Sequence, residues 1–164
     1  MKRSCLIVAM FAVVLVLAAP SARAQGGTKK KAEISGDLDL EKDSAHNLEV
    51  AWNYFKLKKA YVAALQRCEE IIAGDPAFAK IDKALFIAGE SNLYLSQGRG
   101  KQKPSLYVRH DGENKRTLTT EEFRQEAREY LSQLVNNHPD SPYRQQAQDD
   151  LKDLGGLKPK ESKQ

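Results

Sequence analysis

The sequence has little cysteine and lacks the short motifs that mark many catalytic sites. Cys5 and Cys68 are its only cysteines, too few for a framework of disulfides. It contains no Gly-rich phosphate loop, no Gly-x-Ser-x-Gly nucleophile elbow and no zinc-binding pattern. These absences argue against catalysis, and we expect a protein that is not an enzyme and that needs no cofactor.

Metal ligands and acid–base pairs are also missing from the sequence. None of the histidines has a second ligand at metal-binding spacing, so no metal site is expected. Adjacent carboxylates point in different directions on a helix, and such pairs predict solvated helix faces rather than catalytic pairs. The histidines are His46, His110 and His138, and the carboxylate pairs are Glu69 with Glu70, Glu121 with Glu122, and Asp149 with Asp150.

Long apolar runs are scarce, with one exception at the N-terminus. Two basic residues precede an unbroken apolar run at residues 6–19, and Ala22 and Ala24 occupy the small-residue positions of a secretory cleavage site. This three-part pattern predicts a signal peptide at residues 1–24. A membrane anchor is the alternative, but a spanning helix needs about 20 apolar residues, and this run ends at Pro20.

Removal of the signal peptide changes the charge balance. The segment holds three of the 26 basic residues and none of the 22 acidic ones, which leaves 23 basic against 22 acidic residues and a net charge of +1. Nucleic-acid-binding proteins usually show a much stronger basic field, so no nucleic-acid partner is expected. Cys5 precedes the apolar run, where it cannot serve as the lipidated cysteine of a bacterial lipoprotein. We therefore expect a soluble protein that is periplasmic or secreted.

The mature chain divides into a helical domain and two polar flanks. Gly- and charge-rich composition predicts a flexible leader at residues 25–43 and a disordered tail at residues 155–164. Between them, at residues 44–154, apolar residues recur at helical spacing. Five helices are expected to begin near residues 44, 60, 78, 119 and 141. Ser44 is the predicted cap of the first helix, and Thr119 with Glu122 has the spacing of a capping box.

Two parts of this domain repeat each other at a displacement of 63 residues. Six positions at helical spacing recur in register, which indicates a duplicated helix, turn and helix. The pairs are Ala64 with Ala127, Cys68 with Leu131, Ile71 with Leu134, Ile72 with Val135, Pro76 with Pro139, and Ala84 with Ala147. Because Cys68 stands where the second unit has leucine, we expect a buried thiol that packs as a small hydrophobe. A reactive redox thiol is the alternative.

The duplicated unit resembles the tetratricopeptide repeat (TPR) family. The resemblance rests on Ala64 within the second helix of a unit, on apolar residues four and seven positions later, and on Pro76 twelve positions later. The phrases YVAALQRCEEIIAGDP and NNHPDSPYRQQAQDDL also resemble bacterial envelope members, including the BamD-type outer-membrane assembly lipoproteins and the Tol-Pal-associated periplasmic proteins. The chain differs from the lipoproteins in lacking the lipidation cysteine.

The resemblance implies an all-α fold, a helical-hairpin solenoid of about two and a half repeats. It also implies an exported scaffold or adaptor that binds protein or peptide partners in the cell envelope, in outer-membrane assembly or envelope maintenance. The groove lined by the first helix of each repeat would then include Asn53, Lys56 and Asn92. Ordinary solvated surface is the alternative for these three residues.

Residues 98–118 interrupt the repeat with a segment of different character. The family's unit is about 34 residues, so a displacement of 63 leaves about 29 residues, close to the size of this insertion. It carries six Lys or Arg residues against two acidic ones. The alternating segment SLYVRHDGENKRTL predicts a β-hairpin that turns around Asp111 and Gly112. In this hairpin Leu106, Tyr107 and Val108 would lie opposite Arg116, Thr117 and Leu118.

The hairpin is the best functional candidate in the sequence. We expect an aromatic and basic tip that contacts an anionic partner such as an acidic protein surface, lipid headgroups or peptidoglycan. Its residues are Tyr107, Arg109, Lys115 and Arg116. A solvated loop without a partner is one alternative. Another is an envelope structural protein that makes its peripheral membrane or peptidoglycan contact through this basic insertion.

Overall fold

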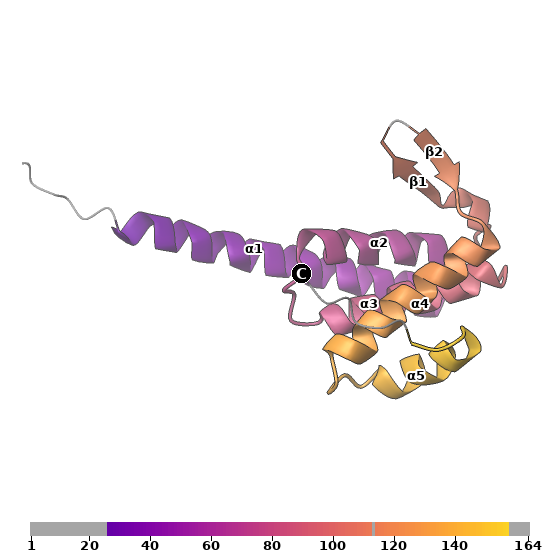
Figure 1. The fold of residues 1–164 in the computed structure, drawn as a ribbon. Helices are drawn as coiled ribbons and strands as arrows, with labels where there is room; N and C mark the ends of the chain where they lie inside the picture. Colours follow the sequence, from indigo (N-terminus) through magenta and orange to yellow (C-terminus); the bar gives the residue numbers. More distant parts are fainter. Residues whose placement is uncertain (1–25, 113, 158–164) are drawn as a thin grey trace, which may run out of the picture.

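A computed structural model of the chain describes residues 26–112 and 114–157. The predicted signal peptide and the last residues of the predicted tail lie outside this part. The described chain is mostly helical, with one small antiparallel sheet (Figure 1). No helix in the described ranges is long and apolar enough to cross a membrane.

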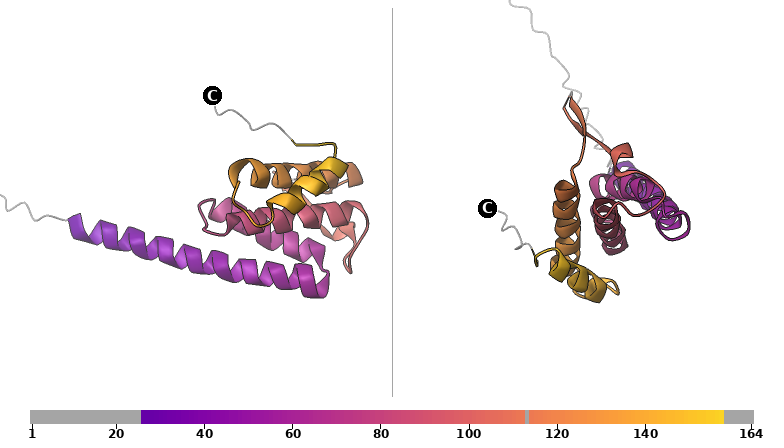
Figure 2. Two further views of the ribbon diagram at one scale, coloured as in Figure 1. Left: turned by 90° about the horizontal axis from the view of Figure 1, so that it is seen from below. Right: turned by 90° about the vertical axis from the view of Figure 1, so that its right-hand side faces the viewer.

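Five helices form the body of the molecule, and a hairpin stands out from it (Figures 1 and 2). The helices are α1 (Gly26–Asn53), α2 (Tyr61–Gly74), α3 (Ile81–Ser96), α4 (Thr120–Asn137) and α5 (Arg144–Asp153). A π-helical turn, η1 (Tyr54–Lys58), ends the first helix. Between α3 and α4 lie a 3₁₀ turn, η2 (Pro104–Leu106), and the strands β1 (Val108–Asp111) and β2 (Asn114–Thr117).

The first helix starts earlier than the sequence predicted. Residues 26–43, predicted as a flexible leader, belong to α1, which extends beyond the helical body (Figure 1). No proline occurs in this segment to break the helix. Ser44 is therefore not an N-cap but lies inside the helix. Its buried hydroxyl donates a hydrogen bond of 2.9 Å to Oδ2 of Asp75 and ties α1 to the end of α2.

The same backbone hydrogen bonds recur in the two helix–turn–helix units, α2–α3 and α4–α5, as the predicted duplication requires. In the first turn the Asp75 N–H donates to the Ile71 carbonyl at 2.8 Å, and in the second His138 donates to Leu134 at 2.9 Å. The bonds that follow also match at the same displacement of 63 residues. They are Phe78 to Asp75 and Ser141 to His138, and then Ile81 to Phe78 and Arg144 to Ser141.

The core lies between the successive helices and contains most of the repeated positions. Ala64, Ala127, Cys68 and Leu131 are fully buried, because the small side chains allow close helix packing and the larger ones fill the space beside them. Cys68 has no disulfide, and burial raises the pKa of its thiol. The predicted packing role of Cys68 is confirmed, since a buried thiol with a raised pKa is poorly reactive.

Candidate functional site

The candidate site is the β-hairpin between α3 and α4, together with its base on the helices. β1 and β2 pair antiparallel, and they project from the end of the molecule where α3 ends and α4 begins (Figure 1). Gly112 has a φ of +63° in the turn, a conformation that glycine adopts without steric cost. The predicted hairpin and its turn at Asp111 and Gly112 are thus confirmed.

The register of the hairpin differs from the prediction by one residue. Val108 pairs with Thr117, whereas the sequence pattern placed it opposite Arg116. The reason is the two-residue connection between Asp111 and Asn114, which sets the pairing of all residues below it. Leu106 belongs to η2 rather than to a strand.

Tyr107 anchors the base of the hairpin and is not part of an exposed tip. Its side chain is only 5% exposed, and its hydroxyl donates a hydrogen bond of 2.6 Å to Oε1 of Glu69 on α2. Its ring meets Phe123 on α4 edge to face at a centroid distance of 5.7 Å. Burial and the neighbouring Glu69 raise the pKa of the Tyr107 hydroxyl. Tyr107 therefore fixes the hairpin to two helices at once.

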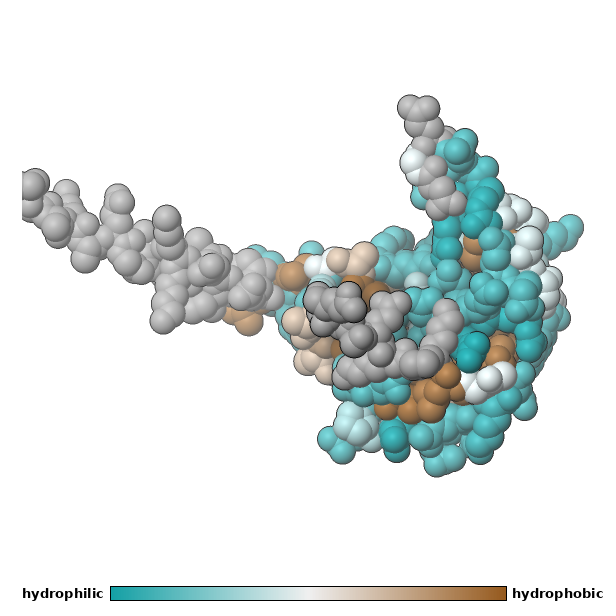
Figure 3. Space-filling model, viewed as in Figure 1, coloured by the Kyte–Doolittle hydropathy of each residue, from teal (hydrophilic) through white to brown (hydrophobic). Residues whose placement is uncertain are grey.

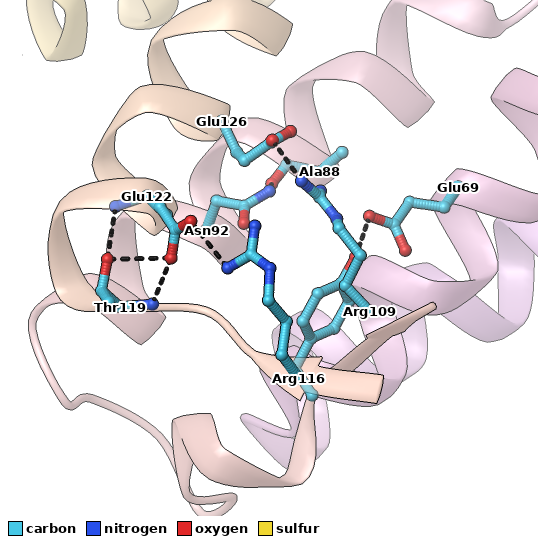
Figure 4. A network of polar contacts seen from close by, with 9 residues as sticks. Glu69, Ala88, Asn92, Arg109, Arg116, Thr119, Glu122 and Glu126 are labelled. Carbon is cyan, nitrogen blue, oxygen red and sulfur yellow. Dashed lines mark hydrogen bonds and ion pairs between the residues drawn. The ribbon is translucent and has the colours of Figure 1, made fainter. Parts of the chain in front are cut away.

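Two arginines complete the attachment of the hairpin to α4. Arg109 and Arg116 lie directly opposite each other on β1 and β2, where two like charges would repel. Each has a carboxylate partner one helical turn apart on α4. Arg109 pairs with Glu126 at 2.8 Å, and Arg116 pairs with Glu122 at 2.7 Å (Figure 4). Because the two glutamates are four residues apart, their side chains lie on the same face of α4. Each carboxylate therefore reaches the arginine of one strand.

The start of α4 holds Glu122 in position for this contact. Thr119 and Glu122 form the predicted capping box, in which the Thr119 Oγ1 accepts from the Glu122 N–H and a Glu122 oxygen accepts from the Thr119 N–H (Figure 4). These hydrogen bonds, with that from Arg116, lower the pKa of Glu122 to about 2. The carboxylate therefore stays ionised and paired across the physiological pH range.

Glu69 lies beneath the hairpin as a largely buried carboxyl group. Burial raises its pKa, while the hydrogen bond from Tyr107 and the nearby charge of Arg109 act in the opposite direction. The expectation that Glu69 lies on a solvated helix face was wrong, because the insertion covers this part of α2. Together Glu69, Tyr107, Arg109 and Glu126 form a polar cluster between α2, α4 and the base of the hairpin, and Figure 4 labels Glu69, Arg109 and Glu126 of this cluster.

The remaining predicted site residues are placed apart from this cluster. Lys115 is exposed on β2, beyond the paired arginines. Lys56 is exposed in η1 with its Nζ 5.0 Å from the ring centroid of Trp52, and Asn53 is half-buried at the end of α1. Asn92 is 1% exposed, and its Nδ2 donates to the Ala88 carbonyl at 3.0 Å. Its predicted place on a groove surface was wrong, because α3 is covered on all sides by neighbouring helices.

The base residues contributed by the helices were missed by sequence reasoning. Glu69, Glu122 and Glu126 are the carboxyl partners of the hairpin, and only their helical positions hint at this role. Glu122 and Glu126 share a helix face by their spacing, a signal compatible with two basic partners. The sequence does not indicate that the insertion folds back over α2 and α4, so Glu69 carries no local signal at all.

The base of the hairpin and the part above it differ in how firmly they are held. The base is fixed by one buried tyrosine and two ion pairs, whereas the described part of the hairpin above it is hydrophilic and open to solvent (Figure 3). Each strand pairs on one side only, so the outer edges of both strands carry backbone groups that no other described strand engages. No family model, curated protein or solved structure was found to match the chain.

Proposed function

We propose that this chain is an exported adaptor of the tetratricopeptide-repeat type that binds a protein partner in the bacterial cell envelope through its hairpin. The observation that carries the proposal is the contrast between the fixed base and the open edges of this two-stranded sheet. An unpaired strand edge is a ready template for an extended segment of another protein. The helical units act as the support that sets the direction of the hairpin.

Two features support a protein partner for the hairpin. Val108 is 39% exposed on β1, so an apolar side chain is available next to the backbone edge. Lys115 adds a cation on β2 that can contact an acidic side chain of the incoming segment. Main-chain pairing would supply affinity, and these side chains would supply selectivity. The signal peptide predicted at residues 1–24 and the repeat resemblance support an envelope location for this binding.

Site-specific photo-crosslinking in growing cells tests the proposal directly. A photoreactive amino acid at Val108 or Lys115 is expected to give a protein adduct of defined mass. Lys80, exposed in the turn between α2 and α3, is the matched control and should give none. Adducts from Asn53 and Lys56 but not from the hairpin would move the contact to the helical groove and contradict the proposal.

The base offers a second arm of the same experiment. The double variant Arg109→Ala, Arg116→Ala keeps both strands but removes the ion pairs to Glu126 and Glu122. If partner binding requires the fixed orientation of the hairpin, the yield of the adduct from Lys115 should decrease several-fold in this variant. Circular dichroism should show that the variant remains folded. An unchanged adduct would show that the fixed base is not needed for the partner.

A further inference from the structure

Two segments far apart in the sequence meet at one end of the helical body. The turn from η1 into α2 lies against the chain that leaves α3, where the Lys101 N–H donates to the Lys59 carbonyl at 2.9 Å. The Ala63 N–H donates to Oε1 of Gln102 at 3.1 Å. Gly100 packs so closely that an added Cβ would lie 2.5 Å from Cδ2 of Tyr61. The juxtaposition is therefore built by specific contacts.

These two segments carry positive charge only. All their charged side chains are cationic and exposed, and no acidic residue occurs in residues 50–68 or 91–110. We call this surface the basic end. Its residues are Lys56, Lys58, Lys59, Arg99, Lys101 and Lys103.

The cations of the basic end are not neutralised within the described part of the chain. Lys59, Lys101 and Lys103 form no ion pair with any described residue. The acidic residues at the start of α4 have other partners, since Glu122 pairs with Arg116 and Glu121 lies 3.8 Å from Arg124. The α1, α2 and α3 side of this end therefore has a net positive field, although the mature chain as a whole is nearly neutral.

Large apolar side chains are exposed among these cations. Leu57 is 75% exposed between Lys56 and Lys58, and Leu106 is 59% exposed beyond Lys103. Half-buried aromatic rings lie beneath the cations, with the Lys58 Nζ 4.8 Å from the ring centroid of Tyr54. Exposed leucine flanked by lysine, over aromatic rings, is a composition that suits the boundary between lipid headgroups and acyl chains.

We propose that the basic end binds the surface of a bilayer rich in anionic phospholipids, with its lysines at the headgroups and Leu57 entering the interface. The charge pattern favours lipid over an acidic protein, because spread cations with an exposed leucine need no complementary shape in the partner. Anionic headgroups attract each nearby lysine or arginine, and apolar insertion adds to this attraction. The proposal goes beyond partner binding by the hairpin and does not depend on it.

Co-sedimentation with vesicles tests this assignment on a chain that begins at Gln25, which keeps every described element. Vesicles of phosphatidylglycerol and phosphatidylcholine in equal parts are compared with phosphatidylcholine alone. Binding is expected only to the anionic vesicles, and it should weaken at high salt because exposed charges are screened. The double variant Lys58→Gln, Lys101→Gln should bind at least about tenfold more weakly, given the attraction expected for each lysine.

Matched controls separate charge and apolar insertion from loss of fold. Lys42→Gln, Lys80→Gln removes the same charge away from the basic end and should change binding by less than about threefold. Leu57→Gln should weaken binding about fivefold or more, whereas Leu40→Gln, on the exposed part of α1, should not. Thermal unfolding of each variant shows that the fold is kept.

Three outcomes would overturn the assignment. Equal binding to neutral and anionic vesicles would exclude a charge-selective surface. Equal losses of vesicle binding in Lys58→Gln, Lys101→Gln and in Lys42→Gln, Lys80→Gln would show that binding depends on the net charge of the protein and not on the basic end. Binding of polyglutamate that depends on Lys58 and Lys101 but not on Leu57, without binding to anionic vesicles, would show that the basic end recognises an acidic polymer instead.

Discussion

The two helix–turn–helix units share their backbone geometry but differ in what surrounds them. α3, in the first unit, is buried along most of its length because α1, α2, α4 and α5 all contact it. In α5 only Ala147 and Leu151 are buried, and an open pocket of about 350 Å³ lies between α5 and the residues that follow it, partly lined by Leu151 and Leu157. The comparison teaches that the repeat sets the backbone, while the neighbouring elements decide which side chains each position needs.

The largest expected effect comes from the paired positions Cys68 and Leu131. Both side chains are fully buried at equivalent places in α2 and α4. Leu131→Ala should lower the free energy of unfolding by about 3 kcal/mol, since it removes three carbons from the core and leaves a cavity. Cys68→Ala removes one atom and should cost about 1 kcal/mol. Urea unfolding measures both, and equal losses would contradict the idea that the second unit relies on larger core groups.

Gly89 and Lys152 occupy equivalent places in α3 and α5 and should respond differently to alanine. A Cβ at Gly89 would lie 2.6 Å from Cδ2 of Leu131, so Gly89→Ala should cost about 2 kcal/mol through overpacking. Lys152→Ala, on the exposed side of α5, should leave the free energy of unfolding nearly unchanged.

A double variant sharpens this contrast. If the cost of Gly89→Ala comes from Leu131, then Gly89→Ala combined with Leu131→Ala should lose less stability than the two single losses added together. Additive losses would mean that the cost of Gly89→Ala comes from the backbone of α3 and not from the contact between residue 89 and Leu131.

Asp150 and its counterpart Ile87 show how the second unit accommodates a carboxyl group where the first unit has a buried apolar side chain. Burial and the adjacent carboxyl of Glu90 raise the pKa of Asp150 to about 8. The folded state then holds a proton that the unfolded chain loses near pH 4, so stability should fall as the pH rises from about 4 to about 8. Glu69, with a raised pKa, adds to the same trend.

Asp150→Asn should remove its share of this pH dependence and raise the free energy of unfolding at pH 8 by about 1 kcal/mol, a value reduced for its partial exposure. Asp149→Asn is the matched control with the opposite sign. Hydrogen bonds from Lys152 and Gln145 lower the pKa of Asp149, so its contribution is lost as the pH falls. Urea unfolding between pH 4 and pH 9 distinguishes them, and parallel curves for wild type and Asp150→Asn would contradict the assigned pKa.

Local signals in the sequence predicted much of this architecture. The displacement of 63 residues predicted both helix–turn–helix units, because the same apolar spacing and the same Pro positions dictate the same turn. Thr119 with Glu122 predicted the start of α4, and Asp111 with Gly112 predicted the turn of the hairpin. These features depend on residues that lie close together in the chain.

Features that depend on distant contacts were not predictable in this way. Serine is a common N-cap residue, but the Ser44 hydroxyl donates to the carboxylate of Asp75. The sequence pattern does not indicate that these two residues lie close together. Tyr107 was assigned to an exposed tip because only the fold shows that it lies against Glu69 and Phe123. Asn92 was placed on a surface because its helix was expected to have a free face, whereas neighbouring helices cover it.

The two units also begin in different ways, which predicts a smaller difference in stability. α4 begins with the capping box of Thr119 and Glu122, whereas no side-chain hydrogen bond caps α2 at Ala60. Thr119→Ala should therefore lower the free energy of unfolding by about 1 kcal/mol, since it leaves the Glu122 N–H without its acceptor. Thr119→Ser keeps the hydroxyl and is the matched control. A loss equal to that of Thr119→Ala would assign the effect to the methyl group.

The smallest expected effect is a gain, at the residue that follows η1. Lys59 has a φ of 54°, a left-handed conformation that disfavours side chains with a Cβ. Lys59→Gly should raise the free energy of unfolding by about 0.5 kcal/mol, the balance of relieved strain and the greater entropy of glycine in the unfolded chain. The same change removes one cation of the basic end, so binding to anionic vesicles should weaken as stability rises. If Lys59→Gly were more stable and bound anionic vesicles as well as the wild type, the contribution of Lys59 to membrane binding would be contradicted.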